Sequence, residues 1–291
     1  MGFDSLRQDV IDAGLLKRQY RYYALKFFIL AGLFALSVFL LITLNNFGLQ
    51  LLNAVFLSFV MVQLAMYMHD SAHNQIFKSG WKNDLAACFT GNILNYVSSA
   101  TWAYQHNIHH VAPNDEEDDP DVNISFLAYS KEQALSKKGL ARFVVKHQAF
   151  FWFPLVTLAA ISKRISLFKI LIKNFNTGKV KHPRLDAALV IVGLSLYLGT
   201  IFYFLNLWQA IVFIIVNQLV TGLYMGTVFA TNHKGMPLID NKTKIDFMSM
   251  QVLTTRNVKG SPLVDFWTGG LNYQIEHHLF PNMPRSNLSK A

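Results

Sequence analysis

Charge is scarce in this sequence of 291 residues. Only 15% of the residues are Asp, Glu, Lys or Arg, whereas 52% are hydrophobic. A soluble domain usually carries about 25% charged residues. Together with a mean hydropathy of +0.27, this deficit argues against a soluble protein and indicates a chain that lies in a membrane.

Cysteine is almost absent, because Cys88 is the only one in the chain. One cysteine cannot form an intrachain disulfide, and it cannot build a thiolate cluster. A metal ion bound by this chain must therefore be held by nitrogen and oxygen ligands.

The net charge of +9 is not arranged for binding nucleic acid. The basic residues form neither an arm nor a recognition helix; they flank apolar stretches, as in membrane proteins with cytoplasmic loops. We therefore expect a lipid bilayer, and no nucleic acid, as the partner of the basic residues.

Two long stretches contain no charged residue, Phe27–Met68 and Ala187–Asn232. Each is about twice the roughly 20 residues that one helical crossing of a hydrocarbon core requires. Polar residues near the middle of each stretch, at 45–48 and 206–209, indicate turns. The pattern predicts two helical hairpins, with spans at about 27–45, 48–68, 187–205 and 209–230.

Basic residues indicate which side of the membrane carries the loops. The segment 163–184 is rich in lysine and arginine, whereas both hairpin turns are uncharged. The positive-inside rule places this segment in the cytoplasm. Within it, Ile161–Asn176 has the pattern of a basic amphipathic helix in the interface. The sequence predicts an all-α, multi-pass membrane protein with four transmembrane helices and a cytoplasmic helical cap.

Eight of the ten histidines lie in four short motifs. Residues spaced i, i+3 and i+4 share one face of a helix, so the histidines of one motif can converge. The first motif directly follows the first charge-free stretch, and the fourth follows the second. Four crossings return the chain to one side of the membrane, so we expect all the motifs there. The residues are His69 and His73, His106, His109 and His110, His277 and His278, and His233.

Imidazole is a ligand that suits iron, copper, nickel and zinc. Eight imidazoles exceed what one ion with an open position needs, and zinc favours about four ligands. The pattern therefore favours two octahedral metal ions, each with room for a further ligand, over a single zinc ion. Gln274 stands where a third motif would begin with histidine and is a candidate weak ligand or hydrogen-bond donor, while Asp70 is expected to orient a histidine through its ring N–H. His147 and His182 have no such partners, and we interpret them as structural.

The motifs occur in the order H-D-x-x-H, H-N-x-H-H and Q-I-E-H-H-L-F-P, the last being Gln274–Pro281. This order resembles the membrane fatty acid desaturase family, in particular its acyl-CoA and acyl-lipid branch, which includes the front-end desaturases. Flanking runs such as Gly269–Tyr273 agree, and Pro281–Arg285 is similar to bacterial members. A bacterial inner membrane is therefore favoured over the endoplasmic reticulum.

The resemblance implies an enzyme that inserts a double bond into an acyl chain with O2 and two electrons at a non-haem di-iron centre. It implies that the eight histidines of the four motifs ligate iron, with no catalytic residue beyond them. The substrate would be an acyl-CoA or an acyl-lipid.

Two features depart from many family members. A His-Pro-Gly-Gly haem motif is missing, so we expect no fused cytochrome b5 domain and an external electron donor of the ferredoxin or cytochrome b5 type. The sequence ends soon after His278, which is compatible with a fragment or a shortened member. We expect a single membrane desaturase domain over 1–291.

Other functions remain open at this point. A hydroxylase or ketolase on the same scaffold shares the oxidant and differs in the fate of the substrate. A membrane zinc hydrolase would usually carry H-E-x-x-H, but Asp70 occupies the second position. A metal carrier would place its ligands inside the spans. The acidic run Asp115–Asp121 is interpreted as a solvated loop, with a cover over the metal site as the alternative.

Overall fold

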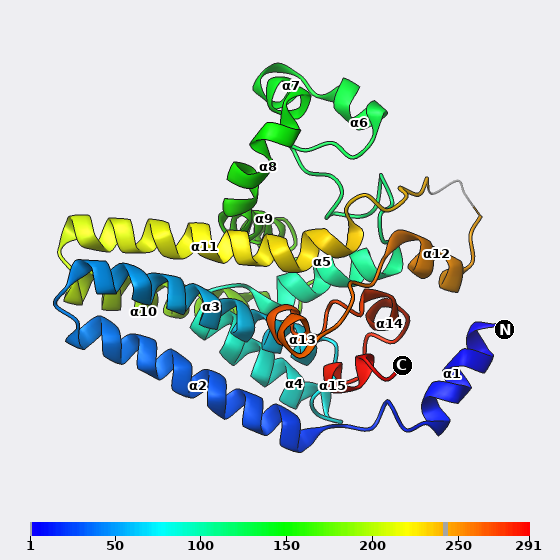
Figure 1. The fold of residues 1–291 in the computed structure, drawn as a ribbon, viewed down its shortest axis with the longest axis horizontal. Coiled ribbons are helices and arrows are strands. Elements are labelled where there is room, and N and C mark those ends of the chain that lie inside the picture. Colours follow the sequence, from blue (N-terminus) through cyan, green and yellow to red (C-terminus); the bar gives the residue numbers. More distant parts are fainter. Residues whose placement is uncertain (1, 241–243) are drawn as a thin grey trace. The chain divides into compact units, whose positions relative to one another are not determined.

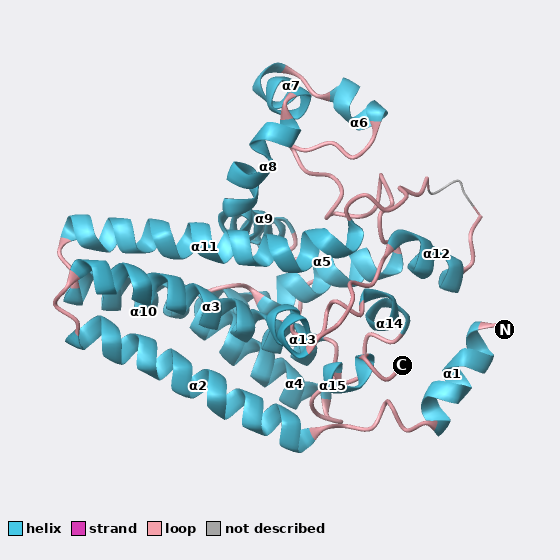
Figure 2. Cartoon of the chain, viewed as in Figure 1, coloured by secondary structure: helices cyan, strands magenta, loops and turns pink. Residues whose placement is uncertain are grey.

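The computed structural model describes residues 2–240 and 244–291. These residues form helices joined by loops (Figure 2) and include no β-strand; one isolated bridge pairs Asp115 with Ile239. The prediction of an all-α protein is confirmed.

The chain folds into two compact units. One comprises Arg18–Ala103 and Thr157–Gly226, and we call it the membrane unit. The other comprises Met1–Lys17, Tyr104–Val156 and Thr227–Ala291, and we call it the histidine unit. A single domain over 1–291 stays a prediction.

Four helices are long and apolar enough to cross a membrane, as predicted (Figure 1). They extend beyond the charge-free stretches, because a helix can continue into the interface, where charged side chains meet water. Thus the first of them begins at Tyr20 and includes Arg21 and Lys26. The four helices are α2 (Tyr20–Thr43), α3 (Phe47–Ala72), α10 (Pro183–Phe204) and α11 (Leu207–His233).

The turn between α2 and α3 is closed by polar side chains. The Asn46 side chain accepts a hydrogen bond from the Leu49 backbone N–H at 3.1 Å and caps α3. Buried Gln50 donates to the last carbonyl groups of α2, at 3.0 Å to Leu41 and 2.8 Å to Leu44. Unsatisfied backbone groups are costly in hydrocarbon, so these bonds explain why the hairpin turns here.

Buried polar pairs join the long helices to one another. Ser58 on α3 donates to the Asn217 carbonyl on α11 at 2.8 Å, and the Asn217 amide donates to the Ala54 carbonyl at 3.2 Å. Further along both helices, Gln63 donates to the Tyr224 hydroxyl at 2.8 Å. Such bonds are a common means of association between helices in an apolar environment.

Between the hairpins the chain forms α4 (Gly80–Ala87) and the π-helix η1 (Cys88–Ile93). Gly193 of α10 lies against the η1 backbone, where an added Cβ would be 2.2 Å from the Asn92 carbonyl oxygen. Nearby, the buried Asp186 carboxylate accepts from Asn92 at 2.7 Å and from the Ser98 hydroxyl. These contacts fix the start of α10 on the π-helix.

The predicted basic amphipathic helix is α9 (Ala159–Lys173). Leu167 and Leu171 are buried in the protein, whereas Ile165, Phe168 and Ile172 are exposed. An exposed apolar row beside lysines is what an interfacial helix presents to a bilayer. Its location in the interface stays a prediction.

The histidine unit has a core of its own. Val10 of the first helix packs with Phe280 and Met283 near the end of the chain. The Asn287 side chain donates to the Leu15 carbonyl at 2.7 Å. The helices of this unit are α1 (Phe3–Asp12), α6 (Lys131–Ser136), α7 (Gly139–Lys146), α12 (Phe247–Thr254), α13 (Pro262–Thr268), α14 (Gln274–Leu279) and α15 (Arg285–Leu288). Three further helices contain points where the chain passes between the units: α5 (Ser99–Val111), α8 (Gln148–Thr157) and α11.

Candidate metal centre

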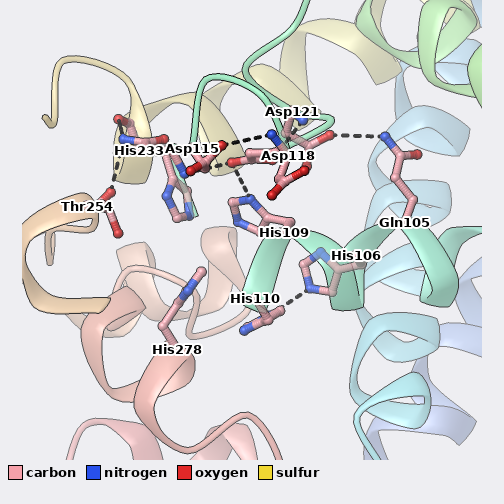
Figure 3. A network of polar contacts seen from close by, with 12 residues as sticks. Gln105, His106, His109, His110, Asp115, Asp118, Asp121, His233, Thr254 and His278 are labelled. Atoms are coloured by element: carbon pink, nitrogen blue, oxygen red, sulfur yellow. Dashed lines mark hydrogen bonds and ion pairs between the residues drawn. The ribbon is translucent and has the colours of Figure 1, made fainter. Parts of the chain in front are cut away.

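Six of the eight predicted histidines gather inside the histidine unit. Figure 3 shows those that lie around His109. The six come from three elements that are far apart in the sequence. Helix α5 presents three histidines at i, i+3 and i+4, short helix α14 presents two, and α11 ends on one. All six side chains are buried: His106, His109, His110, His233, His277 and His278.

His109, His233 and His278 form the tightest group, one from each element. Their ring centroids are 4.6 Å (His109–His233), 4.8 Å (His233–His278) and 5.1 Å (His109–His278) apart. One ligand nitrogen from each lies within 4.8 Å of the others. Three buried imidazoles at this spacing match the donor set of a transition-metal site.

His106, His110 and His277 extend the cluster. The ring of His110 is 4.6 Å from that of His106 and 4.8 Å from that of His277. The Nε2 atoms of His110 and His106 are 3.0 Å apart, a hydrogen bond in which one nitrogen carries a proton. If a metal ion took both Nε2 nitrogens, that proton would have to move to the Nδ1 atom of the same ring.

The remaining two predicted ligands belong to the membrane unit. His69 and His73 lie at the end of α3, with ring centroids 4.7 Å apart, and His69 packs edge-on against Trp102 at 5.5 Å. Asp70 Oδ1 is 3.2 Å from His69 Nδ1. Their part in one centre with the other six stays a prediction from the sequence.

Asp119 contacts the histidine cluster through His109. Its Oδ2 is 2.9 Å from His109 Nδ1 and accepts from the Asn114 backbone N–H at 2.8 Å. An ionised carboxylate only accepts, so the His109 proton lies on Nδ1 and a lone pair is left at Nε2 for a metal. Asp119 is buried and lies in the acidic run; this run is therefore not simply a solvated loop.

Gln274 contacts His233. Its Nε2 is 2.9 Å from His233 Nε2, while its Oε1 accepts from Asn232 at 3.1 Å. The Asn232 amide nitrogen also donates to the Leu271 carbonyl at 2.7 Å. A carbonyl only accepts, so the nitrogen of Asn232 is the atom that faces Gln274 Oε1, and the nitrogen of Gln274 faces His233. With its nitrogen toward the imidazole, Gln274 acts as a hydrogen-bond donor, and this arrangement favours that role over a weak ligand.

Asn114 holds the segment that follows α11. Its backbone has a φ of 57°, in the left-handed region that asparagine tolerates better than most residues. Its side-chain nitrogen lies 3.2 Å from the carbonyl oxygens of His233 and Pro237 and 3.3 Å from that of Thr254. This role was not predicted from the sequence, although the Pro113-Asn114 pair shortly after the second histidine motif is a turn signal.

A cavity of about 670 Å³ opens beside His233. Lys234 lies over the Tyr129 ring at 4.2 Å and donates to the Asp121 carbonyl at 2.8 Å. Burial raises the pKa of the Tyr129 hydroxyl, and the neighbouring Asp121 raises it further, so this hydroxyl stays protonated at neutral pH. The cavity is thus lined by the candidate ligand His233 together with the neutral Tyr129 and the cationic Lys234.

The two other histidines lie outside the candidate ligand groups of the described residues. His147 follows α7, with its ring 5.0 Å from that of Phe143. His182 precedes α10 with a φ of 43°. Nothing in the surroundings of His147 or in the backbone at His182 indicates a metal ligand.

A helical membrane protein with a buried histidine cluster fit for metal binding is the class that this fold and site define. Comparison with known proteins gives the family. The family model described as "Fatty acid desaturase" matches residues 46–291, and the chain belongs to that family.

Relatives agree over nearly the whole chain. An acyl-lipid (9-3)-desaturase of Physcomitrium patens is 31% identical over 99% of this chain, which covers 55% of that protein. A Delta(5) fatty acid desaturase of Caenorhabditis elegans is 33% identical over 99% of this chain, which covers 65% of that protein. The chain thus spans less than two thirds of the length of these two relatives.

Proposed function

We propose that this protein is an O2-dependent fatty acyl desaturase that inserts a double bond into the chain of an acyl-CoA or acyl-lipid. The observation that carries the proposal is the buried group of His109, His233 and His278, contributed by three separate elements. Family membership supports it, as do the relatives that are named as desaturases.

The proposed reaction removes two hydrogen atoms from adjacent carbons of the acyl chain. With two electrons and two protons from outside, these hydrogens reduce one O2 to two molecules of water. A pair of bound iron ions would supply the activation of O2 that breaking an unactivated C–H bond requires. We propose the eight motif histidines as the ligands of these ions.

The protein's own contribution is to hold neutral imidazoles ready and to keep the site dry. Asp119 fixes the proton of His109 on Nδ1, and the Gln274 amide nitrogen lies against His233. Burial of the cluster excludes bulk water, which protects a reactive site from side reactions. The acyl chain would need an apolar path to this cluster, and its placement there would choose the carbon that reacts.

Further parts of the proposal concern partners and location. Electrons would come from a separate ferredoxin or cytochrome b5 type protein. The basic segment 163–184 supports a cytoplasmic site, since lysine and arginine concentrate on that side. We propose a bacterial inner membrane as its location.

Product analysis tests the reaction. The iron-loaded protein in lipid nanodiscs would receive an 18-carbon acyl-CoA or the matching phospholipid, with O2, ferredoxin and its reductase. We expect a product lighter by two hydrogens. His233→Ala should abolish it, and His147→Ala should retain it because His147 lies outside the cluster.

The alternatives give different products in the same assay. A hydroxylase or ketolase would yield a product that has gained oxygen. A zinc hydrolase would consume no O2 and would work without the reductant. Either result would overturn the desaturase proposal.

A further inference from the structure

Gln251 is a fully buried polar residue on α12, a helix whose other residues, apart from Thr254, are at least partly exposed. Its relative exposure is 0%, whereas its neighbours Val252 and Leu253 on α12 are 41% and 48% exposed. A buried amide must find hydrogen-bond partners, because leaving it without them is costly. The partners of Gln251 are two residues of the histidine cluster.

The two hydrogen bonds determine which way the amide points. Gln251 Nε2 donates to the His110 backbone carbonyl at 3.1 Å. A carbonyl oxygen only accepts, so the nitrogen of the amide must face His110. The amide oxygen therefore faces His278, where Oε1 is 2.8 Å from Nδ1.

The direction of the amide in turn determines the tautomer of His278. An amide oxygen only accepts, so His278 Nδ1 must carry the proton. A neutral imidazole protonated on Nδ1 presents its lone pair at Nε2, the form in which it ligates a metal.

We propose that Gln251 is a positioning residue that sets the tautomer of His278 and joins α14 to α5 around the metal. The proposal rests on the proposed function, since it assigns Gln251 a role toward the metal ligands. One side chain thereby connects the second and third histidine motifs, from a helix that carries no histidine.

Two substitutions separate the parts of this role. Gln251→Met keeps the approximate shape and removes both hydrogen bonds. Gln251→Glu still accepts from His278 Nδ1 in either protonation state, while an ionised carboxylate loses the bond to the His110 carbonyl. Val252→Met is the matched control, because it places the same side chain on the exposed face of the same helix.

The test uses Co2+ binding to the metal-free protein, with visible absorption of the bound ion and competition against a chelator. Loss of a residue that orients a metal ligand typically weakens metal binding by roughly 10–100-fold. We expect that loss for Gln251→Met, together with an altered cobalt spectrum. Val252→Met should match the unsubstituted protein, and Gln251→Glu should resemble it in spectrum.

The outcomes distinguish this proposal from the proposed function. If Gln251→Met binds Co2+ with unchanged affinity and spectrum, Gln251 is not a positioning residue, although the metal centre stands. If the unsubstituted protein binds neither Co2+ nor iron, the proposed function fails and this role fails with it.

A purely structural role would lower thermal stability and leave the spectrum of the bound cobalt unchanged, which would also overturn the proposal. If Gln251→Met does not fold, the folded Gln251→Glu protein decides. If Gln251→Glu retains the cobalt spectrum, the result supports a side-chain oxygen at position 251 as the acceptor for His278 Nδ1. If the spectrum is lost, the result contradicts that role.

Discussion

Each of three histidines in the cluster motifs has a hydrogen-bond acceptor at its Nδ1 atom. Asp70 lies 3.2 Å from His69, Asp119 lies 2.9 Å from His109, and the third acceptor is Gln251. Carboxylates strengthen the basicity of an imidazole more than an amide does. The acceptors therefore differ in charge while fixing the same tautomer.

The substitution Asp119→Asn tests whether the Asp119 carboxylate fixes the tautomer of His109. An asparagine can present its NH2 to His109 Nδ1, which would reverse the tautomer and weaken metal binding. It also replaces a charged acceptor of the Asn114 and Asp121 backbone N–H groups. We expect iron content to fall and stability to drop by about 1–3 kcal/mol.

Iron analysis and thermal unfolding of the purified protein check this prediction. Asp118→Asn is the control, because Asp118 is an exposed neighbour in the same acidic run. An Asp119→Asn protein with the iron content and stability of the control would contradict the orienting role.

The histidines could be predicted from sequence because their spacing on a helix is a local property. Asp119 and Gln251 could not. Asp119 lies in a run of acidic residues, which alone suggests a solvated loop. Gln251 is 27 residues from His278 and far from His110, so its two partners become evident only when the chain has folded.

At the scale of elements, the four long helices were predictable because helices of soluble proteins rarely lack charged residues over such lengths. Their ends were not, since α2 and α3 continue past the apolar stretches. The π-helix η1 was not predicted either. Its backbone lies against α10, where Asn92 and Ile93 meet Gly193, a long-range contact that the local sequence does not show.

Gly193→Ala tests that packing. An added Cβ would lie 2.2 Å from the Asn92 carbonyl oxygen and 2.6 Å from that of Ile93, and both are backbone atoms that cannot rotate away. We expect a loss of about 1–3 kcal/mol or more, measured by thermal unfolding in detergent. Gly199→Ala on the same helix meets no atom within 4 Å and should be neutral or stabilising. Equal stability of the two variants would contradict the close contact.

At the scale of the whole molecule, the sequence predicted the family because its motifs occur in a specific order. The family match over residues 46–291 confirms that prediction. The division into two compact units was not predicted, since the segments of each unit are interleaved along the chain. The hydropathy pattern indicates which segments can cross a membrane, but it does not indicate which segments pack together into one unit.

The central proposal is that the histidine motifs hold iron, which serves the oxidation of an acyl chain. The most direct test is metal analysis combined with Mössbauer spectroscopy of protein produced with iron and zinc both present. We predict about two iron ions per chain, in a histidine-rich environment, with little zinc. His147→Ala should keep the iron, and His233→Ala should lose part of it. One zinc ion per chain, or iron content that His233→Ala does not change, would contradict this central role.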